Sequence, residues 1–350
     1  MFRKYRLPAE WEEQACVQLT WPDPSTEWYA LDDVLGCYTR IAASILRFEP
    51  LLIVCRSIDE CRQDLLRKKA ELGLGLDVDA IRFYEIPVND TWARDHGAIS
   101  LYGEDGEKRV LDFVFNGWGL KYGSDLDNQI NRRLYAAGAF AADVKYQDMR
   151  PFVLEGGSIE SDGAGTLMTT TECLCSLNRN DYLTRDQIEE CLVESFGLRR
   201  VLWLNHGSIK GDDTDSHVDN LARFCSPDTI AYTRCEDPAD ENAPALAAME
   251  EELRSFRTLD GRPYKLVPLP LPDAIYLDDY RLPGSYSNFL ILNGAVLVPG
   301  ACTPKDEVAR ERLQQVFPDR EVIVIDCRPL LSGFGGLHCI TMNYPKDWIR

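Results

Sequence analysis

The chain has 350 residues, of which 45% are hydrophobic and 27% charged, and its formal net charge at pH 7 is −19. This composition is typical of a folded globular protein and excludes a disordered chain. The negative charge argues against nucleic acid or an anionic membrane as a partner, because phosphate contacts need clustered Lys and Arg. The charge either serves solubility alone or attracts a cationic substrate.

No apolar run approaches the roughly 18 residues of a membrane span, and residues 1–8 lack the apolar core of a secretory signal. We therefore predict a cytoplasmic protein. Most of the 12 cysteines are scattered in apolar runs, which is typical of reduced, buried thiols. Cys173 and Cys175 form a C-x-C pair, but no second paired-Cys segment completes a metal site. We interpret the pair as part of a strand.

In chain order, the predicted elements alternate between strands and amphipathic helices. Helices are expected over 32–47, 58–73, 126–139, 184–196, 241–257 and 305–316. Strands are expected over 51–55, 81–86, 110–115, 201–204, 289–292, 296–298 and 322–325. Thr184 and Gln187 predict a capping box at the start of the helix from 184.

A helix about every 60 residues, with strands around it, is the pattern of an α/β repeat protein. No low-complexity linker divides the chain. We therefore predict one domain over residues 1–350, built of about five units. An open doubly wound sheet is the alternative.

Four polar segments recur at a nearly constant interval of about 60 residues, or twice that. They are Thr91-Trp92-Ala93-Arg94-Asp95, Glu155-Gly156-Gly157, Asp215-Ser216-His217-Val218-Asp219 and Gly335-Gly336-Leu337-His338-Cys339. The even spacing favours a closed ring whose units each deliver a group to a common centre. The interval after His217 carries Leu277-Asp278-Asp279-Tyr280, which we interpret as a rim or a pocket for the substrate's tail.

Cys339 is the candidate nucleophile. It follows Gly333-Phe334-Gly335-Gly336, and glycines let backbone and ligand approach a reacting atom closely. A thiolate is the reactive form, and a cationic neighbour lowers the thiol pKa from roughly 8.5 toward neutrality. We interpret His338 as packing beside the backbone, and His96 and His206 as structural.

His217 lies in Asp213-Thr214-Asp215-Ser216-His217-Val218-Asp219-Asn220. If this segment is a strand, Asp215, His217 and Asp219 point to one face. An imidazole beside carboxylates suits a general acid/base. The same acids could instead ligate a metal with His217. The segment lacks the Gly and distal Glu of an EF-hand loop, and no H-E-x-x-H is present, so we predict no metal.

Glu155 ends an apolar run and could orient and stabilise the histidine. Asp95 has a similar setting, and two facing carboxylates would bind a planar cation in bidentate fashion. Trp92 could stack on that cation, and a half-buried core Trp is the equally weighted alternative. Arg94 is expected in an ordinary ion pair, and Asp90 in a turn or cap.

Together and in order, these motifs resemble the agmatine deiminase and bacterial peptidyl-arginine deiminase family of the guanidino-group-modifying superfamily. The resemblance covers essentially the whole chain. It rests on Pro8-Ala9-Glu10-Trp11-Glu12, Thr20-Trp21-Pro22, Asn89-Asp90-Thr91-Trp92-Ala93-Arg94-Asp95, Phe115-Asn116-Gly117-Trp118-Gly119, Leu154-Glu155-Gly156-Gly157-Ser158, Asp213-Thr214-Asp215, His217-Val218-Asp219-Asn220 and Gly335-Gly336-Leu337-His338-Cys339-Ile340-Thr341.

The resemblance implies a fivefold pseudo-symmetric α/β propeller of ββαβ units, the pentein fold, with the active site at its axis. It also implies a metal-free deiminase without a cofactor. Cys339 would be the nucleophile, His217 the acid/base and Glu155 its partner. Asp95 and Asp219 would hold the guanidinium, and we add Trp92 and Asp215 as substrate-binding candidates.

The chain departs from the family pattern at three places. Ser216 replaces the usual Gly before the histidine, and Gln14 stands where a histidine is common. The approach to the cysteine reads Gly-Phe-Gly-Gly-Leu-His-Cys, whereas the family tends to have Gly-Gly-Gly-Asn-Ile-His-Cys. None of these removes a catalytic group.

The expected reaction is hydrolysis of a guanidinium through a covalent amidino-cysteine. The leading substrate is agmatine, giving N-carbamoylputrescine and ammonia, and peptidyl or free arginine is the alternative. A metal-dependent hydrolase, a non-enzymatic guanidinium-binding protein and an amidinotransferase are the other interpretations. The expected partner is a small cationic guanidinium compound, with no nucleic acid and no membrane, and a homodimer is compatible with these features.

Overall fold

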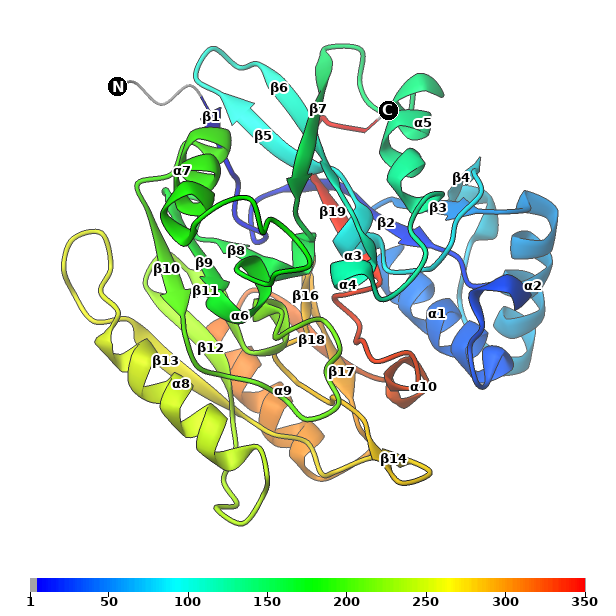
Figure 1. Ribbon diagram of the computed structural model, residues 1–350. Helices are drawn as coiled ribbons and strands as arrows, with labels where there is room; N and C mark the ends of the chain where they lie inside the picture. The colour runs from blue at the N-terminus through cyan, green and yellow to red at the C-terminus, as the bar shows by residue number, and fades with distance from the viewer. Residues whose placement is uncertain (1–4, 350) are drawn as a thin grey trace.

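The computed structural model describes residues 5–349, with strands toward the interior and the longer helices around them (Figure 1). Residues 1–4 and residue 350 lie outside the described residues. Residues 1–4 belong to the segment 1–8 for which the sequence predicts no secretory signal. The fold is mixed α/β, with several small sheets rather than one open sheet. Within residues 5–349 no helix is long and apolar enough to cross a membrane.

Five of the sheets have three or four strands each. Their strand orders are β19(Thr341–Pro345)-β2(Gln14–Thr20)-β3(Leu51–Cys55)-β4(Arg82–Glu85), β1(Tyr5–Arg6)-β5(Ile99–Gly103)-β6(Lys108–Val114)-β7(Val144–Val153), β10(Arg200–Leu204)-β9(Thr166–Thr170)-β8(Ile159–Ser161), β11(Ala222–Ser226)-β12(Thr229–Arg234)-β13(Lys265–Pro270) and β16(Leu290–Ile291)-β17(Ala295–Gly300)-β18(Glu321–Asp326). A separate two-stranded hairpin joins β14(Tyr276–Leu277) to β15(Tyr280–Arg281).

One topology recurs in these five sheets: two antiparallel strands, a helix, and a third strand parallel to the second. The helices after the second strands are α1(Leu31–Ile45), α5(Ile130–Ala136), α7(Arg185–Phe196), α8(Ala243–Ser255) and α9(Lys305–Val316). β19, at the chain's end, pairs with β2 near its start, so the first sheet is completed only by the last strand. The further helices are α2(Ile58–Leu72), α3(Ala93–His96), α4(Gly117–Leu120), α6(Thr171–Leu174) and α10(Arg328–Leu331).

The six helices over 32–316 and the seven strands over 51–325 that were predicted by residue range have counterparts in the structure, with boundaries that shift by a few residues. The capping box of Thr184 and Gln187 is confirmed: the Thr184 hydroxyl accepts from the Gln187 N–H and the Gln187 side chain accepts from the Thr184 N–H. The strand predicted at Cys173 and Cys175 is wrong. Thr170 caps a short helix there, because its hydroxyl accepts from the Cys173 N–H.

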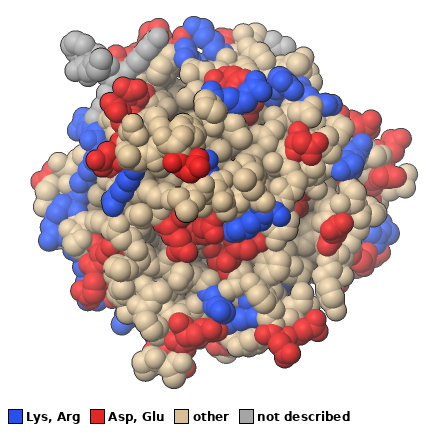
Figure 2. All heavy atoms as spheres, viewed as in Figure 1, with Lys and Arg blue, Asp and Glu red and all other residues tan. Residues whose placement is uncertain are grey.

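The surface carries the charge that the composition indicates. Acidic side chains gather in the middle of the face shown in Figure 2, with Lys and Arg beside them. All 12 cysteines are free thiols, and most are buried.

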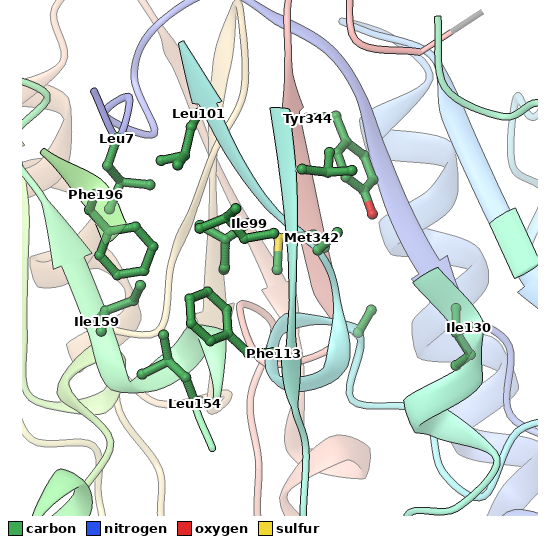
Figure 3. Packing of buried hydrophobic residues seen from close by; sticks show 14 of the residues in the cluster. Leu7, Ile99, Leu101, Phe113, Ile130, Leu154, Ile159, Phe196, Met342 and Tyr344 are labelled. Atoms are coloured by element: carbon green, nitrogen blue, oxygen red, sulfur yellow. The ribbon is translucent and has the colours of Figure 1, made fainter. Parts of the chain in front are cut away.

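A buried apolar cluster joins three of the sheets. Ile99 of β5, Phe113 of β6, Ile159 of β8, Phe196 of α7 and Met342 of β19 belong to it (Figure 3). Burying each of these side chains contributes about 1.5–3 kcal/mol. The cluster therefore fixes the strands β5, β8 and β19 relative to one another, and each of them follows directly on one of the polar segments.

Candidate active site

A cavity of about 380 Å³ contains Trp92, Asp95 and Cys339. The other residues that line it come from segments 25–28, 89–90, 118–123, 213–214 and 332–335. A second, smaller cavity of about 100 Å³ is lined by Glu10, Arg94 and His338 but not by Cys339. Of these two cavities, the larger one therefore gives a ligand access to the candidate nucleophile Cys339.

The Cys339 thiol lies in the turn before β19. The side-chain amide of Asn288 donates to Sγ over 3.2 Å, and Sγ lies 3.8 Å from Asp219 Oδ2. Burial raises the pKa of Cys339 well above its usual value, and the charges of Asp219 and Asp95 raise it further against the effect of Asn288. These influences favour the neutral thiol.

Asp95 lies in α3, directly before β5. Its Oδ2 accepts from the Trp118 indole N–H over 2.8 Å, and its Oδ1 accepts from the Gly157 N–H over 3.1 Å. Burial raises the pKa of Asp95 to about 6, although His217 opposes this effect. Two N–H donors thus hold the Asp95 carboxyl group, which changes between its neutral and ionised forms near pH 6.

Asp219 lies opposite, in a 3-10 turn (Val218–Asn220) before β11. Burial alone would raise its pKa, but the contact with His338, where Nδ1 lies 2.8 Å from Oδ2, and the charges of His217 and Arg223 lower it. The pKa values of Asp95 and Asp219 are therefore shifted in opposite directions. Asp219 is the one that stays ionised more readily.

The predicted packing role of His338 is wrong. Besides Asp219, it contacts Glu10, whose Oε2 lies 2.7 Å from Nε2. Glu10 Oε2 in turn accepts from the fully buried Arg223 over 2.9 Å. A neutral imidazole has a single N–H, so Glu10, His338 and Asp219 share their protons as one unit.

His217 is fully buried, and neither ring nitrogen makes a hydrogen bond to any described residue. Nδ1 lies 3.5 Å from Asp95 Oδ1. Burial alone lowers the pKa of His217, but Asp95, Cys173 and Glu155 outweigh burial and raise it well above the usual value. These acidic neighbours therefore favour the protonated form of the His217 imidazole.

The segment around His217 is not a strand, so that prediction is wrong. Asp215 and Ser216 have φ of 63° and 65°. Side chains satisfy the backbone locally: Thr214 Oγ1 accepts from the His217 N–H over 3.1 Å, and Asp212 Oδ2 accepts from the Ser216 N–H over 2.7 Å. The resulting coil turns Asp215 away from the face of His217.

Glu155 and Asp215 meet at Arg179 rather than at the cavity. Both Glu155 oxygens accept from Arg179 Nε over 3.0 Å, and Asp215 Oδ2 accepts from Arg179 Nη1 over 2.6 Å. Glu155 and Arg179 are fully buried, whereas the side chain of Asp215 is 29% exposed. Neither acid lines the cavity. Arg179 thus fixes the side chain expected beside His217.

Two glycines permit the close packing of the site. A Cβ on Gly157 would lie 2.7 Å from His217 Nδ1, 2.8 Å from Asp95 Oδ1 and 3.1 Å from Asp219 Oδ2. A Cβ on Gly335 would lie 2.1 Å from the Trp92 ring. Both positions admit only glycine without a shift of their neighbours.

Within residues 5–349, one group of three His, Cys, Asp or Glu residues is close enough to hold a metal ion: Glu155, Cys173 and His217. One donor atom of each lies within 4.8 Å of those of the other two. The set considered from the sequence, Asp213, Asp215, His217 and Asp219, is not brought together in this way.

The sequence profile of the Porphyromonas-type peptidyl-arginine deiminase family matches residues 6–345. The chain belongs to this family. An agmatine deiminase of Pseudomonas syringae pv. tomato is 34% identical, with 98% of this chain and 96% of the relative covered. The match over nearly the full length bears out the resemblance identified from the motifs.

Solved structures give the same result. A Porphyromonas gingivalis protein provisionally assigned as an arginine deiminase is 51% identical, with a TM-score of 0.91 over 99% of this chain and 100% of that one. A C. jejuni agmatine deiminase variant with substrate bound is 35% identical, with a TM-score of 0.88 over 99% and 97%. A dimethylarginine dimethylaminohydrolase, 11% identical with a TM-score of 0.52 over 95% and 100%, shares the fold alone.

In this member of the deiminase family, the repeat unit that follows His217 reaches the site through Asn288. The sequence analysis had expected it to do so through the segment 277–280. Asn288 directly precedes strand β16, as Asp95, Glu155 and Cys339 directly precede their strands, and it contacts the thiol. The segment 277–280 instead contributes to the hairpin β14–β15. Its Tyr280 ring packs on Phe334, a cavity residue, with 5.5 Å between centroids. The hairpin touches the rim without lining the cavity.

Other functional residues escaped the sequence reasoning. Arg179 carries no signal of its own, because an isolated Arg in a chain of 350 residues is usually a surface residue. Glu10 lies in the motif Pro8-Ala9-Glu10-Trp11-Glu12 that carries the family resemblance, but no role was predicted for it. The signal available for His338 was its position beside Cys339. His96, expected to be structural, is buried against Thr20 at 3.4 Å, and burial lowers its pKa to about 3.

Proposed function

We propose that the protein hydrolyses the guanidinium group of agmatine to N-carbamoylputrescine and ammonia. The observation that carries this proposal is the composition of the larger cavity. The buried thiol of Cys339 lines it together with the acids Glu27, Asp90, Asp95 and Asp213, and none of the described residues that line it is Lys, Arg or His. Such a site selects a cation.

In the proposed mechanism, Asp95 and Asp219 bind the guanidinium nitrogens and align the plane of the group with Sγ of Cys339. The bound cation replaces the missing positive charge beside the thiol and lowers its pKa. The thiol proton is released to solvent, and the thiolate then attacks the guanidinium carbon, forming the C–S bond. Trp92, which lines the cavity, covers the substrate's alkyl chain.

His217 acts as the acid and then as the base. It donates its proton to the leaving nitrogen, so that the C–N bond breaks and ammonia departs from an amidino-thioether. Water then adds to that carbon, and His217 takes up its proton. The C–S bond breaks, which releases the ureido product and regenerates the thiol. Glu155, held by Arg179 and Asp215, maintains the negative field that keeps His217 protonated.

The preference for agmatine over arginine rests on the distal end of the cavity. Asp90 and Asp213 line it, and burial raises the pKa of each to about 6. Both are therefore ionised near neutral pH and can receive a second cation, such as the primary ammonium of agmatine. The α-carboxylate of free arginine would be repelled. Several relatives at about 34–35% identity are named agmatine deiminase.

We also infer that the five units of two antiparallel strands, a helix and a parallel strand surround a common axis as a fivefold pseudo-symmetric propeller. The pairing of β19 with β2, which joins the two ends of the chain, supports a single closed domain over residues 1–350. The 12 free thiols suit a reducing compartment such as the cytoplasm. We propose no oligomeric state beyond the homodimer that the sequence permits.

The test is ammonia release from agmatine, free arginine and an arginine-containing peptide, with and without a chelator. We expect agmatine to be preferred, activity to persist with the chelator, and iodoacetamide labelling of Cys339 to be blocked by agmatine. A preference for the peptide would move the assignment to peptidyl-arginine. Loss of activity with the chelator would favour a metal-dependent hydrolase, and binding without ammonia release a guanidinium-binding protein.

A further inference from the structure

Cys173 is a buried thiol for which the proposed reaction has no use. It lies in α6, is fully buried, and approaches His217 and Glu155 as described above. A buried cysteine by itself is usually a small hydrophobic residue. Here, however, its neighbours are a buried carboxylate and a buried imidazole, with which the Cys173 thiol itself interacts.

We propose that Glu155, Cys173 and His217 form an inhibitory binding site for a thiophilic divalent metal ion of the Zn²⁺ type. The site itself stands on this geometry alone, and only its inhibitory effect rests on the proposed function. Sulfur, imidazole nitrogen and carboxylate oxygen are the three donors that Zn²⁺ takes in proteins, and three protein ligands with one water complete a tetrahedron.

The surroundings of the three donors are those of metal ligands. A ligating histidine usually has a carboxylate at its other nitrogen, and a ligating carboxylate is itself hydrogen-bonded. Asp95 Oδ1 lies 3.5 Å from His217 Nδ1, which leaves Nε2 for the ion. Arg179 orients Glu155, and its positive charge is balanced by Asp215 at 2.6 Å.

The charge of the site also favours a cation. Asp95 and Asp219 lie on the side of Gly157, and Glu155 on the side of Arg179, so acids outnumber bases around His217. Binding releases the thiol proton of Cys173 and the Nε2 proton of His217 to solvent, and it forms the metal–sulfur and metal–nitrogen bonds. The three donor atoms lie up to 4.8 Å apart, so they must move slightly inward to reach metal–ligand distances of about 2.0–2.3 Å.

The route to the site passes through the substrate cavity. Asp95 lines that cavity and lies next to His217, whereas the three ligands are fully buried. Metal binding should therefore be slow and should be blocked by bound agmatine. A metal ion bound to His217 prevents this residue from protonating the leaving ammonia. A protein molecule that holds the ion therefore cannot turn over substrate.

The test uses Co²⁺ as a spectroscopic probe on the full chain, reduced and freed of metal. We expect one Co²⁺ per chain, with a sulfur-to-cobalt charge-transfer band. The band should persist in Cys339→Ala and in the matched control Cys175→Ala, which changes a neighbouring thiol outside the group. It should be lost in Cys173→Ala. Zn²⁺ should displace Co²⁺, and its affinity should fall by about 100-fold or more in Cys173→Ala, beyond the 10–100-fold effect of losing a group that only orients a ligand.

A second measurement guards against a misfolded variant. Anomalous diffraction from a Zn²⁺-soaked crystal of the unaltered protein should place the ion among Glu155, Cys173 and His217. A band that survives in Cys173→Ala and disappears in Cys339→Ala would put the ion on the nucleophile and overturn the proposal. So would the absence of any cobalt–sulfur band. Because these readouts need no turnover, they stand whether or not agmatine proves to be the substrate.

Discussion

His338 Nδ1 lies 2.8 Å from Asp219 Oδ2, and this contact connects Asp219 to Glu10 near the start of the chain. The contact with His338 is the main influence that lowers the pKa of Asp219 against the effect of burial. We therefore expect His338 to act as a positioning residue that keeps Asp219 ionised and oriented, since His338 itself does not line the larger cavity.

Replacing His338 should weaken catalysis through Asp219. His338→Ala should lower kcat/KM on the order of 10- to 100-fold at neutral pH, the equivalent of a charge-assisted hydrogen bond of about 1.5–3 kcal/mol. Because the pKa of Asp219 would rise, Asp219 should titrate together with Asp95 in the acid limb of the pH profile, and that limb should move to higher pH. His338→Asn, which can still donate to Asp219, should restore part of the loss. The exposed His206→Ala is the control, and an unshifted acid limb in His338→Ala would refute the role.

The pH dependence should also report Asp95. With a pKa raised to about 6, Asp95 becomes protonated as pH falls through that value. It then loses its attraction for the guanidinium, so kcat/KM should decline below about pH 6. In kcat the limb should lie at lower pH, because the bound cation stabilises the carboxylate.

Removing the indole donor of Asp95 should move this limb. Trp118 donates to Oδ2 over 2.8 Å and lowers the pKa of Asp95, so Trp118→Phe should shift the acid limb of kcat/KM to higher pH. Trp203→Phe removes a similar bond, from the indole to Glu189 over 2.7 Å, away from the cavity. It should leave the profile in place. Identical profiles for the two variants would contradict the assignment of the limb to Asp95.

The ionic cluster behind His217 should be costly to break. Arg179→Met leaves Glu155 buried and unpaired, so the free energy of unfolding measured by urea titration should fall by about 3–5 kcal/mol. Adding Glu155→Gln should recover part of this loss, because the uncompensated charge is removed. Arg150→Met breaks an exposed pair with Asp148 and should leave the free energy of unfolding nearly unchanged. A small effect of Arg179→Met would show that water reaches Glu155.

The glycine before the nucleophile should tolerate no side chain. Gly335→Ala would push a methyl group into the Trp92 ring, so either the loop or Trp92 must move, at a cost of about 1–3 kcal/mol. We expect a raised KM for agmatine and slower alkylation of Cys339. Gly75→Ala, where a Cβ meets nothing within 4 Å, is the matched control. Unchanged kinetics in Gly335→Ala would mean that Trp92 does not shape the bound substrate.

The distal acids should act on substrate binding more than on chemistry. Asp213→Asn keeps an acceptor for the Tyr122 hydroxyl, 3.0 Å from Oδ2, and removes the charge. KM for agmatine should rise by about 5-fold while KM for an uncharged-tail alkylguanidine stays constant, since an ion pair of about 1 kcal/mol is lost. Equal effects on both substrates would place the agmatine ammonium elsewhere.

The sequence by itself determined the family, the alternation of strands and helices, and the positions of Cys339, His217 and Asp95. These features are local or periodic. Apolar runs, a capping box and short polar motifs are legible within a few residues, and the regular spacing pointed to units that repeat.

Only the tertiary structure decided which side chains meet. Asn288, Arg179 and Glu10 meet the candidate residues because distant strands end at one place. No local pattern distinguishes Asn288 and Arg179 from surface residues, and the motif around Glu10 does not tell which side chains it contacts. The segment 213–219 coils instead of extending because its own side chains satisfy its backbone. Cys173 lies beside His217, and Asn288 beside Cys339, because long-range packing brings these segments together. Contacts between residues so far apart in the chain depend on the packing of whole strands and helices, and the local sequence around each residue does not encode them.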